Sequence, residues 1–470
     1  MKVEQIYTGC IAHAAYYLES NGEAAIFDPL REVQPYIDRA AKNNAKIKYV
    51  FLTHFHADFV SGHLDLAKKT GAQIVYGPTA NPAYEIIKAT DGQIFKVGDY
   101  SVKVIHTPGH TMESTTYLLI DENQHEHGIV TGDTLFIGDV GRPDLAQHVI
   151  ADLTEDKLAR HLYHSLRTKI MPLSDDLIVY PNHGAGSACG KNMSKETTDT
   201  LGHQKKVNYA LQPMSEDEFV KAILTGLTPP PGYFPKNVLM NIQGYESLDT
   251  VMERAFHALD ADAFELVANE QNALVLDTRN ADDFAAGFIP NSINIGLDGS
   301  FAQWVGEMIP DIKQAILLIT ETGKEEEAMI RLSRVGYDGT LGYLAGGFDT
   351  WKKSGKEIDS IQRMSAQEFE TMYHNQRLPI FDVRKKSEYE SEHVIDANNV
   401  SLNEINQHLA MFPKDQAFVL HCAGGYRSMI AASILKQRGW DNFYDVREGF
   451  TGIAKTTVPK SAYVCPSTML

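Results

Sequence analysis

The chain has 470 residues, of which 43% are hydrophobic and 22% are charged, so it is expected to be globular rather than disordered, fibrous or membrane-embedded. At about 150 residues per domain, this length predicts about three domains. The formal net charge of −18 disfavours nucleic acid and anionic membrane surfaces as partners, because the field around the protein repels polyanions.

The N-terminus and the cysteines bear on the compartment. Residues 1–6 contain no basic segment followed by an apolar core, and no apolar run in the chain reaches the length that spans a bilayer. The four cysteines are far apart in sequence and too few to cross-link a chain of this length: Cys10, Cys189, Cys422 and Cys465. We therefore expect a cytoplasmic protein with free thiols and no membrane partner.

The first half of the chain alternates short strands and helices. Residues 16–18 and 24–28 are predicted to form neighbouring strands joined at Asn21-Gly22, a dipeptide typical of tight turns. Residues 31–43 have apolar side chains at helical spacing, and an apolar strand is predicted over 47–52. Polar loops are therefore expected at the ends of buried strands.

Potential metal ligands follow several of these strands. The first cluster lies in the stretch THFHADF at residues 53–59, and further histidine and aspartate side chains appear in later loops. Burying so many titratable groups would be costly without a metal to coordinate. A lone histidine such as His63 or His203 is instead expected to be an ordinary core or surface residue. The candidate ligands are His54, His56, Asp58, His110, Asp133 and His183.

Two similar units follow the proline-rich stretch at residues 228–235. Asp277 and Asp382 begin matching Asp-x-Arg segments and lie 105 residues apart, and two Gly-Phe pairs, at 347 and 449, lie 102 residues apart. Two matches at nearly the same spacing predict a tandem repeat of a small α/β domain of about 100 residues.

The second unit contains a cysteine in an unusual local setting. Cys422 follows the apolar strand 418–421 and precedes a glycine-containing loop and a helix predicted over 429–438. Backbone N–H groups converge at such a helix N-terminus and stabilise an anion on sulfur, and Arg427 adds positive charge. The first unit has Thr320 at the corresponding position, followed by three glutamates, so it carries no nucleophilic thiol.

Residues 1 to about 240 resemble the metallo-β-lactamase superfamily. The resemblance lies in the stretches at 53–58, 107–111, 131–136 and 181–184. In the dinuclear hydrolases of that superfamily, the first motif usually ends in Asp-His, and these two residues help to hold the second metal. Phe59 replaces that histidine, so a mononuclear site is expected.

The stretch 132–144 is most similar to the persulfide dioxygenases of this superfamily. The resemblance implies one Fe(II) per chain held by His54, His110 and Asp133. Two histidines and one carboxylate with open positions also suit non-haem iron by residue type, with zinc as the alternative. His56, Asp58 and His183 would then orient the ligands, and His56 is the first candidate for an extra ligand.

Two further residues are candidates for substrate contact in this domain. Cys189 follows His183 closely in sequence and could line the same cavity, or it could be a small buried apolar residue. Arg142 could bind an acidic substrate tail, or it could be paired structurally with Asp139 or Asp144.

The second repeat unit resembles rhodanese-type sulfurtransferases. The resemblance rests on Asp382 and Arg384, the segment from Glu388 to Val394, the turn at 448–450 and the loop that begins at Cys422. It implies that Cys422 carries a persulfide. Cysteine phosphatases place five residues between Cys and Arg, whereas four separate Cys422 from Arg427, which favours sulfane sulfur over phosphate. The loop residues assigned to this site are Ala423, Gly424, Gly425, Tyr426 and Ser428, with Cys422 and Arg427 as the catalytic pair.

These observations predict an α/β protein with an αββα metallo-β-lactamase sandwich, followed by two rhodanese-like domains with parallel sheets. The expected boundaries are 1–245 for the metal domain, 246–360 for the domain without the catalytic cysteine and 361–470 for the domain with Cys422.

The expected function is oxidation of a low-molecular-weight thiol persulfide by O2 to sulfite, coupled to sulfur transfer that gives thiosulfate. The alternatives are a zinc thioester hydrolase similar to glyoxalase II and a non-oxidative persulfide carrier. The identity of the thiol is left open, and a homo-oligomer is expected from the resemblance.

Overall fold

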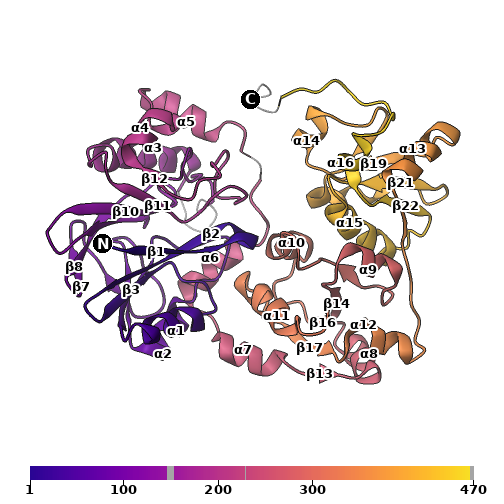
Figure 1. The fold of residues 1–470 in the computed structure, drawn as a ribbon, viewed down its shortest axis with the longest axis horizontal. Coiled ribbons are helices and arrows are strands. Elements are labelled where there is room, and N and C mark those ends of the chain that lie inside the picture. Colours follow the sequence, from indigo (N-terminus) through magenta and orange to yellow (C-terminus); the bar gives the residue numbers. More distant parts are fainter. Residues whose placement is uncertain (146–152, 228, 466–470) are drawn as a thin grey trace. The chain divides into compact units, whose positions relative to one another are not determined.

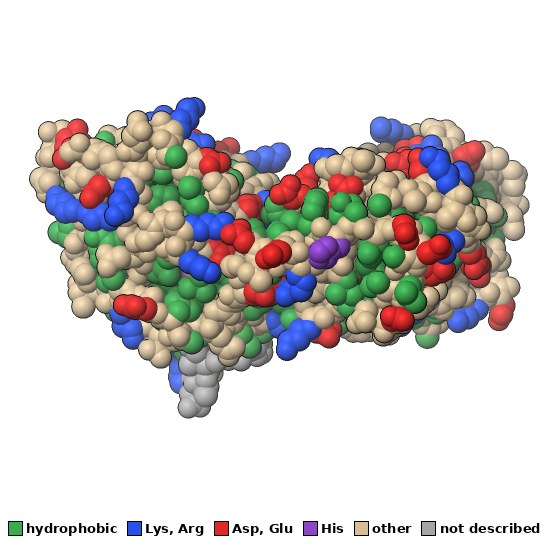
Figure 2. Space-filling view, turned by 90° about the horizontal axis from the view of Figure 1, so that it is seen from below, with side chains coloured by type: hydrophobic (Ala, Val, Ile, Leu, Met, Phe, Trp, Pro, Cys, Tyr) green, Lys and Arg blue, Asp and Glu red, His purple; other side chains and the backbone are tan. Residues whose placement is uncertain are grey.

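The computed structural model describes residues 1–145, 153–227 and 229–465. It consists of two compact units, one formed by Met1–Val251 with Ile330–Asp338 and the other by Met252–Met329 with Gly339–Leu470. Within the described ranges, no helix combines the length and the apolar character needed to cross a membrane. On the face shown in Figure 2, acidic, basic and apolar side chains are interspersed.

The first unit contains two six-stranded sheets that pack face to face. The first sheet has the order β1-β2-β3-β4-β5-β6, and the second has the order β12-β11-β10-β9-β8-β7. The strands of the first sheet are β1 (Val3–Thr8), β2 (His13–Ser20), β3 (Glu23–Phe27), β4 (Lys46–Phe51), β5 (Gln73–Tyr76) and β6 (Ile87–Lys88). Those of the second are β7 (Ile94–Val97), β8 (Tyr100–His106), β9 (Thr115–Ile120), β10 (Glu126–Gly132), β11 (Ile178–Pro181) and β12 (Asp199–Thr200).

Alternation along the strands separates two hydrophobic cores. On β9, Tyr117 and Leu119 point into the core shared by the two sheets, which also contains Phe27 and Phe51. Leu118 points to the opposite face and packs in the core formed with the helices outside the second sheet. Both faces of this sheet are therefore buried.

Helices cover the outer faces of both sheets. In Figure 1, α1 (Gln34–Lys42) and α2 (His63–Thr70) lie on one side of the sandwich. On the other side lie α3 (Glu155–Ser165), α4 (Leu201–Val207) and α5 (Glu216–Leu224). The remaining helices of this region are α6 (Phe234–Gln243) and α7 (Leu248–Ala255). The predicted αββα sandwich is confirmed.

The second unit contains two parallel five-stranded sheets with the same strand order. The sheets are β13-β17-β16-β14-β15 and β18-β22-β21-β19-β20, and every neighbouring pair in both is parallel. Equivalent strands in equivalent positions confirm the predicted tandem repeat of parallel α/β domains.

The first repeat consists of β13 (Ala258–Leu259), α8 (Ala261–Glu270), β14 (Leu274–Asp277), α9 (Ala281–Ala286), β15 (Ile293–Asn294), α10 (Phe301–Met308), β16 (Ile316–Ile319), α11 (Glu325–Arg334), β17 (Thr340–Leu344) and α12 (Gly347–Lys353). The second consists of β18 (Gln362–Met364), α13 (Ala366–Asn375), β19 (Ile380–Asp382), α14 (Lys386–Ser391), β20 (Asn398–Asn399), β21 (Phe418–His421), α15 (Tyr426–Gln437), β22 (Phe443–Val446) and α16 (Gly449–Ile453).

Local predictions agree with these elements to within a few residues. Asn21 and Gly22 both have positive φ, of 45° and 77°, as a tight hairpin turn between β2 and β3 requires. The helix after Cys422 starts at Tyr426, three residues earlier than predicted, so its N-terminus lies directly beside the cysteine loop.

Candidate metal centre and sulfur-transfer site

The loop that carries the first histidines is fixed by side chains from distant parts of the first unit. The Thr53 N–H donates to Asp28 Oδ1 at 2.8 Å, and the Phe55 N–H donates to Glu113 Oε1 at 3.0 Å. Asn241 of α6 donates from Nδ2 to the carbonyl oxygens of His56 and Phe59, at 2.8 and 2.9 Å. These four hydrogen bonds fix the backbone of this loop.

His54, His110 and Asp133 form one group of potential ligands. All three are buried, and one ligand atom from each lies within 4.8 Å of the others. The Nε2 atoms of His54 and His110 lie 3.8 and 3.4 Å from Asp133 Oδ2. These three loops follow β4, β8 and β10, which bring ligands that are far apart in sequence to one edge of the sandwich.

The remaining hydrogen bonds of these histidines fix their orientation. His110 Nδ1 lies 2.8 Å from the carbonyl oxygen of Arg142, to which it donates, and His54 Nδ1 lies 3.0 Å from Thr53 Oγ1. Each Nε2 atom is thereby directed toward Asp133. Burial and the neighbouring histidines hold the pKa of His54 well below its ordinary value, so its imidazole is neutral and suited to ligating a metal.

The residues present fit a metal ion. Asp133 is 1% exposed, and neither of its carboxylate oxygens has a hydrogen-bond partner among the described residues. A buried carboxylate without donors is costly unless a cation faces it. Two imidazole nitrogens and this carboxylate supply a ligand set that iron or zinc accepts.

His56, Asp58 and His183 form a second group beside the first. Their ligand atoms also lie within 4.8 Å of one another. His183 Nε2 lies 3.5 Å from Asp58 Oδ2 and 3.6 Å from Asp133 Oδ1, so Asp133 faces both groups. His56 Nε2 is hydrogen-bonded to Asp28 Oδ1 at 3.0 Å.

Phe59 occupies the space beside this second group. Its side chain is fully buried, and its ring centroid lies 4.3 Å from that of His13 and 4.4 Å from that of His56. An apolar ring therefore stands where a further ligand would have to project. His13 is itself buried, and burial together with the neighbouring histidines keeps its pKa well below the ordinary value.

Cys189 and Arg142 lie close to the candidate ligands. Cys189 is 2% exposed and groups with Asp133 and His183. Burial, followed by the charges of Asp58 and Asp133, raises its pKa well above the ordinary value, so its thiol stays protonated next to these carboxylates. Arg142 forms a bidentate ion pair with Asp144 at 2.7 and 2.6 Å, one of the structural pairings considered for it, and its N–H donates to the Cys189 carbonyl oxygen at 3.0 Å. Its contact with substrate stays a prediction.

The candidate sulfur-transfer site lies between β21 and α15. Cys422 is 1% exposed, and the Gly425 N–H donates to its Sγ at 3.1 Å. Gly425 has φ of 92°, a conformation that favours glycine, and it caps α15. Arg427 forms a bidentate pair with Glu388 at 2.6 and 2.8 Å. A thiolate or persulfide anion on Cys422 is therefore faced by a backbone donor at a positive helix end.

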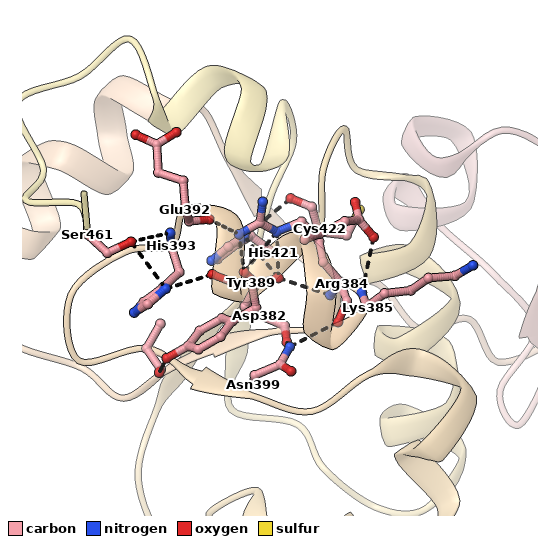
Figure 3. A network of polar contacts seen from close by, with 12 residues as sticks. Asp382, Arg384, Lys385, Tyr389, Glu392, His393, Asn399, His421, Cys422 and Ser461 are labelled. Carbon is pink, nitrogen blue, oxygen red and sulfur yellow. Dashed lines mark hydrogen bonds and ion pairs between the residues drawn. The ribbon is translucent and has the colours of Figure 1, made fainter. Parts of the chain in front are cut away.

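A buried polar network lies next to the cysteine loop (Figure 3). Arg384 donates to both carboxylate oxygens of Asp382, and His421 Nδ1 lies 3.2 Å from the Cys422 carbonyl oxygen and 3.9 Å from Asp382 Oδ1. Burial lowers the pKa of His421 despite the nearby aspartate, so its imidazole is neutral. The Phe450 N–H donates to the same carbonyl oxygen at 2.7 Å, which fixes the backbone of Cys422.

Strand registers locate the equivalent position in the first repeat. Asp277 pairs with Ile319, and Asp382 pairs with His421, so Thr320 occupies the position of Cys422. The helix that follows begins with Glu325, Glu326 and Glu327. These glutamates place negative charge at the start of the helix, where the second repeat has Arg427.

Family models match both parts of the chain. The model of the metallo-beta-lactamase superfamily matches residues 8–183. The crystal structure of a metallo-beta-lactamase from Staphylococcus aureus subsp. aureus COL is 30% identical, with a TM-score of 0.64, and the alignment covers 73% of this chain and 98% of that one. The chain belongs to the metallo-β-lactamase superfamily.

This metallo-β-lactamase superfamily member also contains two rhodanese-like domains, matched at residues 260–354 and 365–456. Its relatives include the hydroxyacylglutathione hydrolase of Tolumonas auensis, 32% identical over 173 residues, where the match covers 36% of this chain and 60% of the relative. The human mitochondrial persulfide dioxygenase ETHE1 is 29% identical over 201 residues, covering 42% of this chain and 70% of the relative. The predicted architecture of one metallo-β-lactamase domain and two rhodanese-like domains is confirmed.

Four residues around the metal centre were absent from the sequence prediction. Asp28, Glu113 and Asn241 hold the backbone of the first histidine loop, and His13 packs on Phe59. The position of Asp28 could have been noticed in the sequence, because it ends an apolar strand directly before a proline. Glu113 lies two residues after the stretch 107–111, whereas His13 and Asn241 lie in stretches without any ligand motif.

Proposed function

We propose that this protein oxidises the persulfide of a low-molecular-weight thiol with O2 and transfers sulfane sulfur through Cys422. In the first reaction, RSSH, O2 and water give RSH, sulfite and two protons, and the four electrons released by the persulfide sulfurs reduce both oxygen atoms. The carrying observation is the buried group of His54, His110 and Asp133, with the buried ring of Phe59 packed against His56 beside it.

In this proposal His54, His110 and Asp133 hold one Fe(II), with zinc as the alternative metal. Ferrous iron would supply the redox chemistry by which O2 reacts with a persulfide. Two histidines and one carboxylate leave positions open for substrate and O2, which favours iron over a closed structural zinc site. Resemblance to the human persulfide dioxygenase supports this assignment.

The surrounding residues shape the reaction in three ways. Phe59 and His13 close the second position and keep the site mononuclear. His56, Asp58 and His183 lie beside the ligands, and His183 is directed by its contact with the Ala12 carbonyl oxygen at 3.2 Å. Arg142 positions His110 through its carbonyl oxygen and the Cys189 loop through its N–H.

The second reaction uses the Cys422 loop. The Cys422 thiolate attacks the outer sulfur of RSSH and releases RSH, which leaves a persulfide on Cys422. Sulfite then removes that outer sulfur as thiosulfate, and the thiolate is restored. The Gly425 N–H and the positive end of α15 stabilise the negative charge on sulfur in both steps, and Arg427 adds positive charge to the loop.

The domain limits in this proposal are 1–245, 246–360 and 361–470, of which the second has no catalytic cysteine. A cytoplasmic location and a homo-oligomeric state are parts of the same proposal, which leaves the identity of the thiol open.

A zinc-dependent thioester hydrolase is the second candidate, because relatives bear the name hydroxyacylglutathione hydrolase. The observation in its favour is the second ligand group of His56, Asp58 and His183. Two features disfavour this candidate. Phe59 stands where the dinuclear hydrolases carry a histidine, and thioester hydrolysis has no use for the sulfur acceptor at the Cys422 loop. A non-oxidative sulfur carrier would need only Cys422 and would leave the metal ligands without a role in catalysis.

The test is to purify the protein without oxygen, measure iron and zinc, and supply glutathione persulfide or coenzyme A persulfide. Uptake of O2 by the iron form with formation of sulfite is expected. Hydrolysis of a hydroxyacylglutathione thioester without O2 uptake would favour the hydrolase. Sulfur transfer without either activity would favour the carrier.

A further inference from the structure

The two repeats of the second unit contact each other through the helix that follows Cys422. The α15 helix lies against β15 of the first repeat. Ser433 Oγ on this helix accepts a hydrogen bond from the Asn294 N–H at 3.0 Å. Tyr426, the first residue of α15, donates from its hydroxyl to the Gly296 carbonyl oxygen at 2.8 Å. The repeat without a cysteine therefore reaches the loop of the repeat that has one.

Gly299 of the first repeat leaves room for the Tyr426 ring, and Gly296 lies in ordinary contact with it. A Cβ atom added at Gly299 would lie 2.3 Å from Tyr426 Cζ, and one added at Gly296 would lie 3.5 Å from Cε2. Neither glycine has a backbone conformation in the left-handed region. The absence of a side chain at Gly299 is thus required by the tyrosine ring rather than by the local backbone.

Tyr426 lies between the two groups that define the cysteine loop. On one side is Gly425, whose N–H donates to Cys422 Sγ. On the other is Arg427, which is paired with Glu388. A change in the position of the tyrosine moves both neighbours, because they share its backbone and the first turn of α15. The contact with Gly296 and Gly299 therefore bears on the geometry around the sulfur.

We infer that the repeat without a cysteine is a working part of the sulfur-transfer site, in which Gly296 and Gly299 form a seat for Tyr426. Tyr426 is a positioning residue: held in this seat, it keeps the Gly425 N–H directed at Cys422. The inference rests on the proposed sulfur transfer at Cys422 and gives the first repeat a role in that step.

The test is a double-mutant cycle across the two repeats in the full-length protein, with Gly299→Ala, Tyr426→Ala and the double variant. Thiosulfate formation from glutathione persulfide and sulfite is measured, and kcat and KM are separated. Gly299→Ala should lower kcat by about threefold to tenfold, the equivalent of one hydrogen bond. The double variant should match Tyr426→Ala alone, because the three atoms nearest to the added methyl group all belong to the tyrosine ring.

Two further variants guard against a general loss of structure. Tyr426→Phe keeps the ring and removes only the hydroxyl, so it should fold normally and still lower kcat. Ser433→Ala removes another hydrogen bond between the repeats, seven residues further along α15, and should leave kcat within twofold of the wild type. Additive losses in the cycle, or equal losses in Tyr426→Phe and Ser433→Ala, would overturn the inference.

The proposed function is tested separately in the same assay. Cys422→Ser should abolish thiosulfate formation, and if it does not, the proposed sulfur transfer itself is wrong. Loss of activity in Cys422→Ser together with an unchanged rate in Gly299→Ala and Tyr426→Phe would refute only the role of the first repeat.

Discussion

Replacing Phe59 with histidine should convert the site from one metal ion to two. The variant adds an imidazole beside His56, Asp58 and His183, whose ligand atoms already lie within 4.8 Å of one another. When a chelator removes the metal, the new imidazole is buried without a partner, which lowers the free energy of unfolding by about 2 kcal/mol. For a domain of this size, the loss corresponds to a fall in Tm of about 4–8 °C. Zinc at a hundred times its Kd would stabilise the folded variant by about 2.7 kcal/mol.

The assay combines metal content with thermal unfolding. After loading with zinc and removal of the excess, Phe59→His should hold two ions per chain and the wild type one, and its Tm deficit should disappear. Phe59→Leu is the matched control, because it removes the ring without adding a ligand and should remain destabilised with or without zinc. Two ions in the wild type, or identical behaviour of the histidine and leucine variants, would refute the role assigned to Phe59.

Three further predictions concern the groups that support the two sites. Arg427→Gln should slow thiosulfate formation by about tenfold or more, because it removes a charge-assisted pair at the cysteine loop. Arg438→Gln, at the other end of α15, is the control and should leave this rate unchanged. Burial raises the pKa of Glu388, but the hydrogen bonds and charge of Arg427 outweigh it and leave the pKa lowered. The stability from this pair is therefore complete above the ordinary pKa of glutamate and is lost as pH falls through the lower pKa of the folded state. The Tm difference between wild type and Glu388→Gln should shrink over that acidic range. A Tm difference that stays constant would contradict the pairing of Glu388 with Arg427. Asn241→Leu leaves the carbonyl oxygens of His56 and Phe59 without their donor. Metal affinity should fall by about 10-fold to 100-fold in a chelator competition. Unchanged affinity would show that these two hydrogen bonds are not needed for metal binding.

Much of the architecture follows from local patterns in the sequence. The strand over β4 and the polar residues after it were predictable because apolar runs end where ligand side chains begin. The tandem repeat was predictable because Asp277 and Asp382 begin equivalent segments at the ends of β14 and β19. Each of these signals lies within a few consecutive residues.

The contacts that hold the sites in shape could not be predicted in the same way. Asn241 lies more than 180 residues from the backbone groups that it binds, and an asparagine in an ordinary helix carries no mark of that role. The contact between Tyr426 and Gly299 likewise depends on how two repeats pack. Sequence spacing identified Arg142 as a candidate for substrate contact but did not distinguish that role from its ion pair with Asp144.

The central claim is that O2 oxidises a persulfide at the site formed by His54, His110 and Asp133. The most direct measurement uses Cys422→Ser, in which sulfur transfer is blocked, prepared without oxygen and loaded with Fe(II). O2 uptake and sulfite formation are followed together after glutathione persulfide is added. The account predicts one sulfite for each O2 consumed, no thiosulfate, and loss of both signals when His110→Ala is introduced as well. Iron-loaded protein that consumes no O2 with any thiol persulfide, or O2 uptake that survives His110→Ala, would contradict it.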